Sequence, residues 1–509
     1  MRNRRVKPPK ALVIGVDGGS LDVIEPLLVA GALPRLRSFL DRSAYGTSTT
    51  TWPAHTAPGW ATFVTARQPG GHGIYQFFDT QDADYGDRIL GSGDFGCSTA
   101  WEWLAAQGLS VGLINVPMSH PPVDLPGYQI TWPLAPTLRY SRPATLLAEL
   151  STAGAPFASD LLTMYQGDPD YVDFAIKNVH SRGRSIEHLL RNRPVDVVMA
   201  VFTEVDRVCH HYWHFADCYH GRHDAAPSKA EWTEAIRATY VALDQVLGEL
   251  LDLVGDETTV LMASDHGFGP GRSNVAVNAA LEEAGLLVTQ AGPTEHAPWF
   301  SGDGRSVDFT RTHAYMPTPG CYGVNVNLRG RQRAGAVGAT ETDRLTAELT
   351  DLFLDLTDPR SGTHPFAAVL PRAEAYPGAM TAGAPDLLLL PADEGVLADP
   401  HIGGPTWAPS QQTGMHRYEG MWALRSGRVV AGRRSTPIAL HDLMPTLLHA
   451  LDLRQPAEAL GRPDPLLLPN SALPWLPDPA ASAAGADRSS ERVRDHELTA
   501  EILSTMGYL

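Results

Sequence analysis

The segment Ala11-Leu-Val-Ile-Gly-Val-Asp17 is a continuous apolar run that ends on an acidic residue. Two later segments repeat this pattern, namely Asp196-Val-Val-Met-Ala-Val-Phe-Thr-Glu-Val-Asp206 and Thr259-Val-Leu-Met-Ala-Ser-Asp265. Continuous rather than alternating apolar character is typical of strands that helices cover on both faces. The three segments therefore predict strands of one buried, parallel sheet.

Helical patterns lie between these runs. The clearest one places apolar residues at Ile236, Tyr240, Leu243, Leu247 and Leu250, and this 4-3-4-3 spacing puts them on one face of a helix. Further strand candidates are the segments 110–115, 322–328, 386–390 and 420–424. The alternation of strands and helices indicates a doubly wound α/β fold.

The chain has 509 residues, with 40 basic and 57 acidic side chains and a formal net charge of -17. This length allows one large α/β body with insertions, or roughly three separate domains. The excess of acidic residues argues against binding to a nucleic acid polymer or an anionic membrane, because both need a basic surface. A small anionic substrate stays compatible with this charge if a local group reverses its sign.

The four cysteines include no Cys-x-x-Cys pair, so the sequence indicates neither a disulfide scaffold nor a cysteine zinc site. The basic residues at the start precede only a short apolar run, from Ala11 to Val16, which is too short for a signal peptide. No other apolar stretch approaches the ~20 residues of a membrane span. We therefore expect a cytoplasmic protein with no membrane association.

The expected catalytic domain spans residues 8–475. Two segments inside it, about 133–180 and 290–380, are richer in Pro, Gly and polar residues and lack long apolar runs, so we expect cap insertions there. From Asp478 the sequence Pro-Ala-Ala-Ser-Ala-Ala-Gly-Ala-Asp is typical of a linker. Residues 476–509 are thus expected to form a linker and a C-terminal helical tail.

Three acids stand where the predicted strands end, at Asp17, Asp206 and Asp265. Ligands of open parallel sheets bind in the crevice outside the carboxyl ends of the strands, so the three side chains are expected to meet there. A single acid at a strand end is more often a turn former or a helix cap. Three acids at one edge are harder to explain in that way.

Histidines accompany two of these acids. Asp206 and His210 are four residues apart, which places both on one face of a helical turn, and His266 follows Asp265 directly. Asp and neutral His are ligands for zinc, manganese or iron, and several of each suit a two-metal hydrolytic site better than a calcium cage. His210 and His214 have the same spacing and are the alternative pair, and each histidine could instead be a structural imidazole.

The segment Thr51-Trp-Pro-Ala-His-Thr56-Ala-Pro-Gly-Trp60 offers a hydroxyl group. Thr56 stands where a helix N-cap is expected, with a proline in the first turn and apolar residues after it. It is either a cap alone or a nucleophile that a divalent metal and the positive helix end activate. A further histidine, His416, lies in the Gly-flanked segment Thr413 to Gly420.

Together these blocks resemble the alkaline phosphatase superfamily, and most closely its type I phosphodiesterase and nucleotide pyrophosphatase branch, which includes bacterial predicted phosphohydrolases and phosphomutases. The resemblance covers almost the whole chain. Its other motifs are Pro69-Gly-Gly-His72-Gly-Ile74, Arg311-Thr-His-Ala-Tyr315, Asn325-Val-Asn-Leu-Arg-Gly330, Ala384-Pro-Asp386, Asp442-Leu-Met-Pro-Thr446 and Met506-Gly-Tyr-Leu509.

The resemblance implies a three-layer α/β/α sandwich with a mostly parallel central sheet and cap insertions. It also implies two divalent metal ions, usually zinc, with manganese as the alternative. One ion would be bound by Asp206, His210 and His416. The other would be bound by Asp17, Asp265, His266 and the oxygen of Thr56.

The resemblance further implies a phosphodiesterase or nucleotide pyrophosphatase that cleaves a small phosphate ester through a covalent phospho-threonine at Thr56. A Thr nucleophile favours this branch, because phosphomonoesterases and cofactor-independent mutases of the superfamily usually carry Ser. The alternatives are a phosphomutase or phosphomonoesterase on the same scaffold, or a metal-binding protein without enzymatic activity.

One position departs from the family pattern. Nucleotide pyrophosphatases carry an Asn three residues after the nucleophile that donates to a phosphoryl oxygen, whereas this chain has Gly59 there. The backbone N–H of Ala57 is a substitute donor. Arg207 and Arg417 are candidates for binding charged oxygens, with surface salt bridges as the alternative. His72 is expected to support a loop rather than to act in catalysis.

Overall fold

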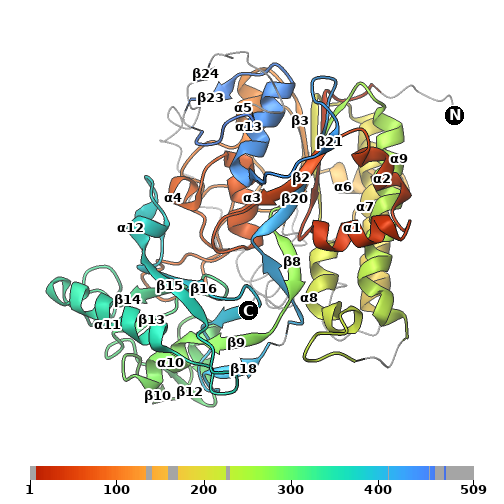
Figure 1. Cartoon of the computed structure of the whole chain (residues 1–509). Coiled ribbons are helices and arrows are strands. Elements are labelled where there is room, and N and C mark those ends of the chain that lie inside the picture. Colours follow the sequence, from red (N-terminus) through yellow and green to blue (C-terminus); the bar gives the residue numbers. More distant parts are fainter. Residues whose placement is uncertain are drawn as a thin grey trace.

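The computed structural model describes residues 7–132, 140–158, 170–224, 230–410, 412–457, 459–464 and 475–476. The expected linker and helical tail fall almost entirely outside these residues. Two lobes are visible in Figure 1, a large lobe around a central sheet and a small lobe below it. The small lobe consists of residues 271–413, and it is joined to the large lobe through the antiparallel pair β8 (Gly267–Pro270) and β19 (Gly414–Arg417).

The central sheet of the large lobe has ten strands in the order β21-β2-β20-β7-β1-β6-β3-β4-β5, with β22 beside β2. Its strands are β1 (Ala11–Val16), β2 (Ala44–Thr49), β3 (Val111–Val116), β4 (Gly127–Thr131), β5 (Ser141–Arg142), β6 (Val197–Phe202), β7 (Thr259–Ala263), β20 (Glu419–Arg425), β21 (Gly432–Arg433) and β22 (Ile438–Ala439). The strands β7, β1, β6, β3 and β4 run parallel to one another, while β20 is antiparallel to both β7 and β2. The mostly parallel sheet is therefore confirmed.

Side chains of β1 alternate between two separate hydrophobic cores. Leu12, Ile14 and Val16 pack into the core on one face, and Ala11 and Val13 into the core on the other. This alternation follows from the two-residue period of a strand. Because both faces of the sheet are buried, every position of such a strand favours an apolar residue. Burial on both faces thus explains the continuous apolar runs in the sequence.

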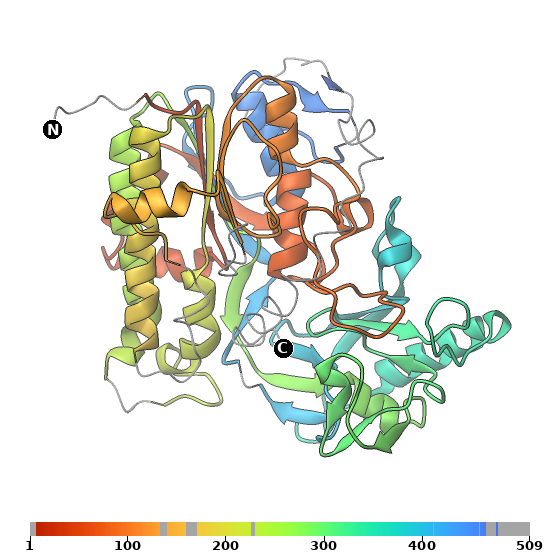
Figure 2. The same ribbon diagram turned by 180° about the vertical axis from the view of Figure 1, so that it is seen from behind.

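Helices cover both faces of the sheet, as Figures 1 and 2 show. One face carries α1 (Leu21–Val29), α2 (Pro34–Leu40), α6 (Leu146–Thr152), α7 (Tyr171–Asn192), α8 (Glu204–Ala216), the 3-10 helix η1 (Ala230–Glu234) and α9 (Ala235–Val254). The other face carries α3 (Thr56–Thr65), α5 (Ala100–Ala106) and α13 (Leu440–Ala450). The three-layer α/β/α sandwich is therefore confirmed. The short elements α4 (Pro69–His72), β23 (Gln455–Pro456) and β24 (Trp475–Leu476) complete this lobe.

The structure describes parts of both segments in which we expect cap insertions. Within 133–180, α6 and the first part of α7 pack on the large lobe, and α7 lies against α9. A buried helix layer needs only one apolar stripe, so a segment of mostly polar composition can still form one. The segment 290–380 does lie in the small lobe, but the small lobe extends beyond it at both ends.

The small lobe contains three small sheets with helices beside them. Its elements are β9 (Ser273–Ala276), α10 (Val277–Glu283), β10 (Thr289–Ala291), η2 (Pro298–Phe300), β11 (Ser301–Gly302), β12 (Arg305–Val307), β13 (Ala314–Tyr315), β14 (Gly323–Val326), η3 (Ala339–Glu341), α11 (Thr342–Asp355), β15 (Phe366–Pro371), α12 (Arg372–Ala375), η4 (Thr381–Gly383), β16 (Leu387–Pro391), β17 (Val396–Asp399) and β18 (Trp407–Pro409). Two motifs of the resemblance stabilise this lobe. Arg331 pairs with Asp386 at 2.7 Å, and the amide of Asn327 donates to the backbone oxygens of Phe309 and Thr312, each at 2.8 Å.

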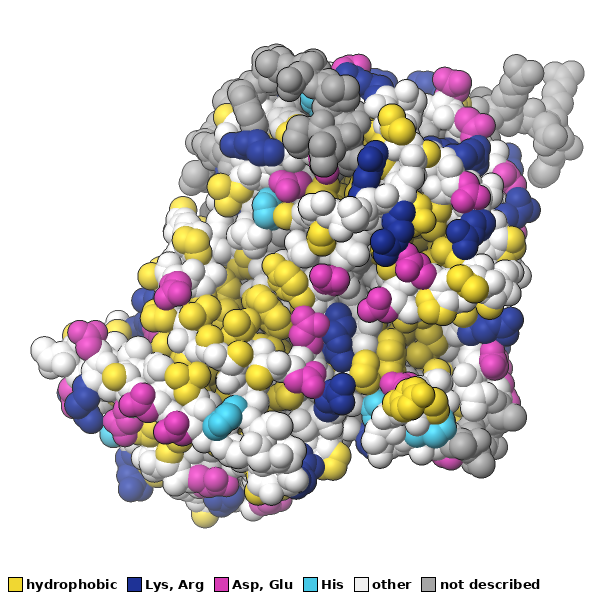
Figure 3. Space-filling model, in the orientation of Figure 1, with side chains coloured by type: hydrophobic (Ala, Val, Ile, Leu, Met, Phe, Trp, Pro, Cys, Tyr) yellow, Lys and Arg dark blue, Asp and Glu magenta, His cyan; other side chains and the backbone are white. Residues whose placement is uncertain are grey.

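Two surface properties bear on the partners of the protein. No helix among the described residues is both long enough and apolar enough to cross a membrane. On the face in Figure 3, basic side chains are interspersed with acidic ones rather than gathered into a broad patch. This face therefore lacks the basic surface that long polyanions require.

Helix α3 packs so closely on β1 that Gly15 has no room for a side chain. A Cβ there would lie 2.4 Å from Cη2 of Trp60 and 2.7 Å from Cγ2 of Val201. We predict that Gly15→Ala lowers the free energy of unfolding by about 1–3 kcal/mol, the usual cost of overpacking a core. Urea-induced unfolding measures this change. Gly427→Ala, where a Cβ meets nothing within 4 Å, is the control, and equal transitions for both variants would refute the packing argument.

Candidate active site

The three predicted acids all lie at the carboxyl edge of the parallel strands. Asp17 directly follows β1, and Asp265 is the second residue after β7. Asp206 is not at a strand end, because β6 stops at Phe202 and Asp206 lies in the first turn of α8. Acids are favourable in a first helical turn because of the positive helix end. The helix also places His210 one turn after Asp206, as the spacing predicted.

The first cluster consists of Asp206, His210 and His416. Nε2 of His416 lies 3.1 Å from Oδ1 of Asp206 and 2.9 Å from Nε2 of His210. Nε2 of His210 is 3.4 Å from the same carboxylate oxygen. His416 reaches this point from far along the chain, because β19 pairs with β8, which begins directly after His266.

The second cluster consists of Asp17, Asp265 and His266. Nε2 of His266 lies 3.3 Å from Oδ2 of Asp265 and 3.6 Å from Oδ1 of Asp17. The two clusters adjoin, since the rings of His266 and His416 stack with centroids 3.7 Å apart. Ligand atoms lie within 4.8 Å of one another in two groups, Asp17–Asp265–His266 and Asp206–His266–His416. His266 therefore stands between the two clusters.

Backbone carbonyls fix the protonation of all three imidazoles. Nδ1 of His210, His266 and His416 lies 2.9–3.0 Å from the oxygens of Gly414, Gly267 and Ala54, respectively. A carbonyl oxygen only accepts, so each Nδ1 carries a proton, and in the neutral ring that binds a metal ion each Nε2 presents a lone pair. The lone pairs of His210 and His416 thus face each other and a carboxylate oxygen. A cation between them resolves this contact, and such orientation of His ligands by carbonyls is typical of metal sites.

Burial controls the charges of the site, because Asp17, Asp206 and Asp265 are at most 1% exposed. Burial, together with the negative charge of Asp206, raises the pKa of Asp17 well above its ordinary value, and burial and both neighbouring acids do the same for Asp265. Burial also acts to raise the pKa of Asp206, but the nearby imidazoles and a guanidinium hold it well below the usual range. The pKa values of His266 and His416 are lowered, chiefly by burial.

These residues fit divalent metal ions by the chemistry of their donors. Neutral imidazoles and carboxylates are the ligands that zinc and manganese take. Oδ2 of Asp265 is buried and accepts no hydrogen bond from the described residues. Like charges confined in a site without water are costly unless a cation neutralises them. The geometry therefore suits metal binding at both clusters.

Thr56 lies at the start of α3, beside the second cluster. It is fully buried, with its Oγ1 3.4 Å from Oδ1 of Asp17 and 3.5 Å from Nε2 of His266. The expectation that Thr56 is the N-cap was wrong by one residue. His55 is the cap, because its backbone is extended and its carbonyl accepts the first helical bond, from the N–H of Gly59 at 2.9 Å. Thr56 is thus the first helical residue, at the positive helix end.

The close approach of α3 to Asp265 explains the glycine at position 59. A Cβ on Gly59 would lie 3.0 Å from Cβ of Asp265 and 3.1 Å from its backbone oxygen. An asparagine would therefore press on a candidate metal ligand. Ala57 is the second residue of the same helix, and its N–H is one of the donors that helical geometry leaves without an intrahelical acceptor.

The two candidate arginines occupy different environments. Arg207 is buried and its Nη1 donates to Oδ2 of Asp206 at 3.2 Å, so it forms a buried ion pair rather than a surface one. Arg417 donates through Nη1 and Nη2 to backbone carbonyls, among them those of Glu394 and Pro270. These bonds hold the Arg417 side chain against β8 rather than at the carboxylate and imidazole clusters.

The remaining histidines of the sequence analysis do not join the clusters. His72 is buried, with Nε2 3.0 Å from Oγ1 of Thr62 and Nδ1 accepting from the N–H of Ile74, which agrees with a role in loop structure. Burial lowers the pKa of His72 to about 3. His214, the alternative partner of His210, lies near His220 instead, with ring centroids 6.2 Å apart.

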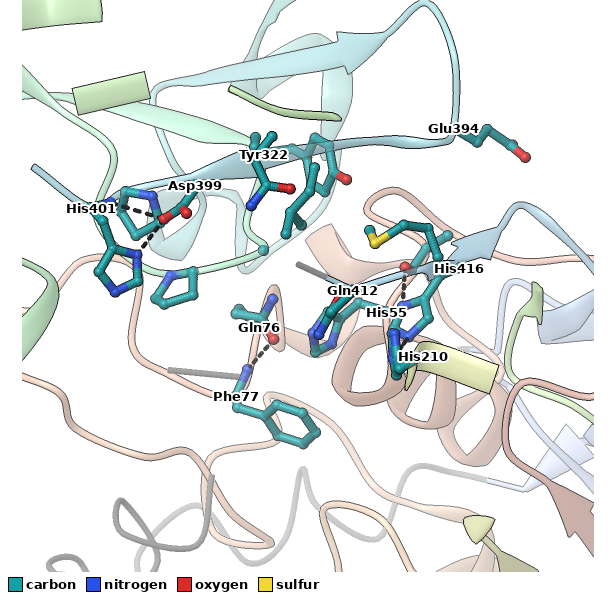
Figure 4. Close-up of a pocket in the computed structure, with 18 of the residues that line it drawn as sticks. His55, Gln76, Phe77, His210, Tyr322, Glu394, Asp399, His401, Gln412 and His416 are labelled. Carbon is teal, nitrogen blue, oxygen red and sulfur yellow. Dashed lines mark hydrogen bonds and ion pairs between the residues drawn. The ribbon is translucent and has the colours of Figure 1, made fainter. Parts of the chain in front are cut away.

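A cavity of about 420 Å³ opens beside the first cluster, between the two lobes. Figure 4 shows His55, His210 and His416 on one side of it, Asp399 and His401 on the other, and Gln76 and Tyr322 between them. Apart from the two cluster histidines, sequence reasoning did not identify these lining residues. Only His55 had a signal, because it lies inside the motif that carries Thr56. The others come from loops of both lobes and follow no short motif.

The fold and the site define a hydrolase of the alkaline phosphatase type, with a sandwich scaffold and adjoining carboxylate and imidazole clusters. A family profile described as type I phosphodiesterase / nucleotide pyrophosphatase matches residues 11–419. The chain belongs to this family and is a phosphoester-hydrolysing enzyme. None of the curated proteins compared with the chain matches its sequence.

Several solved structures share the fold. Phosphonoacetate hydrolase from Sinorhizobium meliloti 1021, in complex with phosphonoformate, has 15% identity and a TM-score of 0.54, over 88% of this chain and 96% of that one. Alkaline phosphatase PafA has 11% identity and a TM-score of 0.55, over 91% and 99%. An inactive variant of murine ectonucleotide pyrophosphatase / phosphodiesterase 5, in complex with AMP, has 13% identity and a TM-score of 0.51, over 89% and 96%. At these identities the likeness shows the fold alone.

The raised pKa of Asp265 predicts a pH dependence of stability in metal-free protein. The folded state binds this proton more tightly than the unfolded chain does, so the stability it contributes is present below the unfolded pKa and lost as the pH rises. Asn does not titrate. We therefore predict that chelator-treated Asp265→Asn gains stability relative to chelated wild type as the pH rises above the unfolded pKa of an aspartate, by up to about 1.4 kcal/mol per pH unit.

Urea unfolding over this pH range measures the gain. Glu257→Gln, which changes an exposed carboxyl, should follow the wild type and is the control. A constant difference between Asp265→Asn and wild type at every pH would contradict the assignment of a buried, proton-binding carboxyl at position 265.

Proposed function

We propose that the enzyme is a two-metal phosphodiesterase that cleaves a small phosphate ester through a covalent phospho-threonine at Thr56. The observation that carries this proposal is the position of the Thr56 hydroxyl, which is fully buried within 3.5 Å of both Asp17 and His266. A threonine that served only as a helix cap would not need two candidate metal ligands beside its oxygen.

The proposed metal ligands divide between the two clusters. Asp17, Asp265, His266 and Thr56 would hold one ion, and Asp206, His210 and His416 the other. We propose zinc in both positions, with manganese as the alternative. Divalent ions supply two kinds of chemistry in such sites, since they lower the pKa of a bound oxygen and stabilise negative charge on phosphoryl oxygens.

The residues of the chain then have the following roles. Oγ1 of Thr56, once its proton is lost, attacks phosphorus, so that an O–P bond to threonine forms while the P–O bond to the leaving group breaks. The departing oxygen takes up a proton and leaves as an alcohol. The N–H of Ala57 and the positive end of α3 stabilise charge on the phosphoryl oxygens. Water then attacks the phospho-threonine, the bond to Thr56 breaks, and a phosphate monoester leaves the site.

The lining of the cavity supports a diester over a monoester. Its walls include Trp52, Phe77 and Tyr322, and the described residues that line it include no lysine or arginine. A monoester carries its second negative charge on the reacting phosphoryl group, where the described lining places no lysine or arginine, whereas a diester carries one charge there. Hydrolysis of a monoester or internal phosphoryl transfer would indicate the phosphatase or mutase alternatives, and no turnover with metal bound would indicate a binding protein.

Replacement of Thr56 tests the proposal. We predict that Thr56→Ala lowers kcat for bis-p-nitrophenyl phosphate by at least about a thousandfold, the scale seen when a nucleophile is removed, while Thr56→Ser keeps part of the activity. Wild type should prefer this diester to p-nitrophenyl phosphate. Release of p-nitrophenol gives the rates, and metal analysis of each variant shows whether the clusters stay loaded. Equal turnover by wild type and Thr56→Ala would refute the nucleophile assignment.

A further inference from the structure

The side of the cavity away from the metal ligands carries a paired aspartate and histidine. Asp399 is the last residue of β17, and its Oδ1 accepts from both the backbone N–H and the ring Nδ1 of His401. Both residues line the same cavity as His210 and His416. Figure 4 shows the pair across the cavity from those two histidines.

The pairing leaves one ring nitrogen of His401 for other contacts. Because a carboxylate only accepts, Nδ1 is the donor to Asp399. No described residue forms a hydrogen bond with Nε2 of His401, and its side chain is 48% exposed, so a ligand in the cavity can reach it. In functional sites, an aspartate often orients a histidine in this way: it accepts from Nδ1 and leaves Nε2 available to a ligand.

The loop does not depend on the side chain of His401 for its shape. The amide of Asn278 donates to the backbone oxygen of Pro400 at 2.6 Å, and Ile402 is buried at 5% exposure. Gly302 also packs against this loop, because a Cβ there would lie 2.2 Å from the oxygen of Ile402. These contacts anchor the residues on both sides of His401, so its side chain is not needed to hold the loop.

The pKa of His401 is shifted in the opposite direction to the pKa values of other histidines that line the cavity. Burial acts to lower the pKa of His401, but the bond to Asp399 outweighs it and the pKa is raised. Burial lowers the pKa of His55, and it lowers that of His211 to about 3. Protonated His401 thus offers a charged N–H donor in a cavity whose described lining contains no lysine or arginine.

We propose that His401, oriented by Asp399, binds an anionic group of the substrate, a carboxylate or a phosphate, on the side of the cavity opposite the metal ligands. This inference rests on the proposed function, because it concerns the substrate of that site. The natural substrate is then a phosphodiester with a second negative charge on the group that His401 contacts. His401 is a binding residue and Asp399 a positioning residue.

A matched set of diesters tests the inference. Every probe carries the single negative charge of its diester phosphate. The probe called neutral, p-nitrophenyl phenyl phosphate, has an uncharged phenyl ring, and the anionic probes carry in addition a carboxylate or a phosphonate at the meta or para position of that ring. The measured quantity is the ratio of kcat/KM for an anionic probe to that for the neutral probe. We expect His401→Gln to lower this ratio about tenfold, mainly through KM, as loss of a charge-assisted hydrogen bond would.

The control is His364→Gln, which changes a histidine of the small lobe that does not line the cavity, and it should leave the ratio unchanged. A larger loss with carboxylate or with phosphonate identifies the preferred anion. A ratio that His401→Gln leaves unchanged for every anionic probe would overturn the inference, while hydrolysis of the probes would still support the proposed function.

Asp399→Asn separates positioning from mere structural support. Loss of its charge should move the pH at which the ratio declines to a lower value, because Asp399 raises the pKa of His401. The other ionisable lining groups, His55, His210, His211, His416 and Glu394, act on the turnover of both probes, and the ratio removes that common effect. An unshifted decline would refute the role of Asp399.

A binding measurement tests the inference even if the enzyme does not hydrolyse the probes. Calorimetry with the Thr56→Ala chain gives the dissociation constants of the neutral and anionic probes, and the same tenfold effect of His401→Gln is expected in their ratio. Absence of hydrolysis by wild type would count against the proposed function alone. Equal dissociation constants for neutral and anionic probes would count against the role of His401 alone.

Discussion

Three carboxylates share one site without solvent access at the edge of the sheet, and this constraint explains much of the structure around it. Asp17, Asp206 and Asp265 cannot all be ionised there unless positive charge is close. The protein provides part of it through Arg207, which pairs with Asp206. Divalent ions would supply the remaining positive charge. The pKa of Asp17 is raised and that of Asp206 is lowered, which shows that the protein alone neutralises the two carboxylates unequally.

Close packing of the backbone is what brings the clusters together. Glycines stand where elements meet: Gly59 lets α3 approach Asp265, and Gly414 lets β19 approach α8, where a Cβ would lie 2.2 Å from the oxygen of Cys209. The indole of Trp60 donates to Oδ2 of Asp17 at 3.1 Å, which links the helix that carries Thr56 to the first strand. The close packing of α3 on Asp265 therefore helps to explain why position 59 carries glycine rather than the asparagine of the family.

The sequence predicts the sheet and the edge at which Asp17 and Asp265 lie because both depend on local signals. Buried parallel strands are apolar throughout, and the residues after them must lie at one edge, so Asp17 and Asp265 could be placed without a structure. The cavity could not be predicted in this way. Asp399, His401 and Tyr322 line the same cavity as His210 and His416 only through the arrangement of the small lobe, and no periodicity or short motif predicts that arrangement. The cap at His55 was missed by one residue because threonine is the commoner cap.

The antiparallel pair of β8 and β19 joins the two lobes, and it therefore connects the proposed substrate cavity to the proposed metal site. The small lobe lies between His266 and His416 in the sequence, and β8 and β19 bring these two histidines into stacked contact. Because side chains alternate along a strand, a shift of the pairing by one residue would turn His416 away from Asp206. Loops of the small lobe can vary in sequence and so change the cavity, as loops on a fixed scaffold do. This variation leaves His416 in place only if Phe268 stays paired with His416 between β8 and β19.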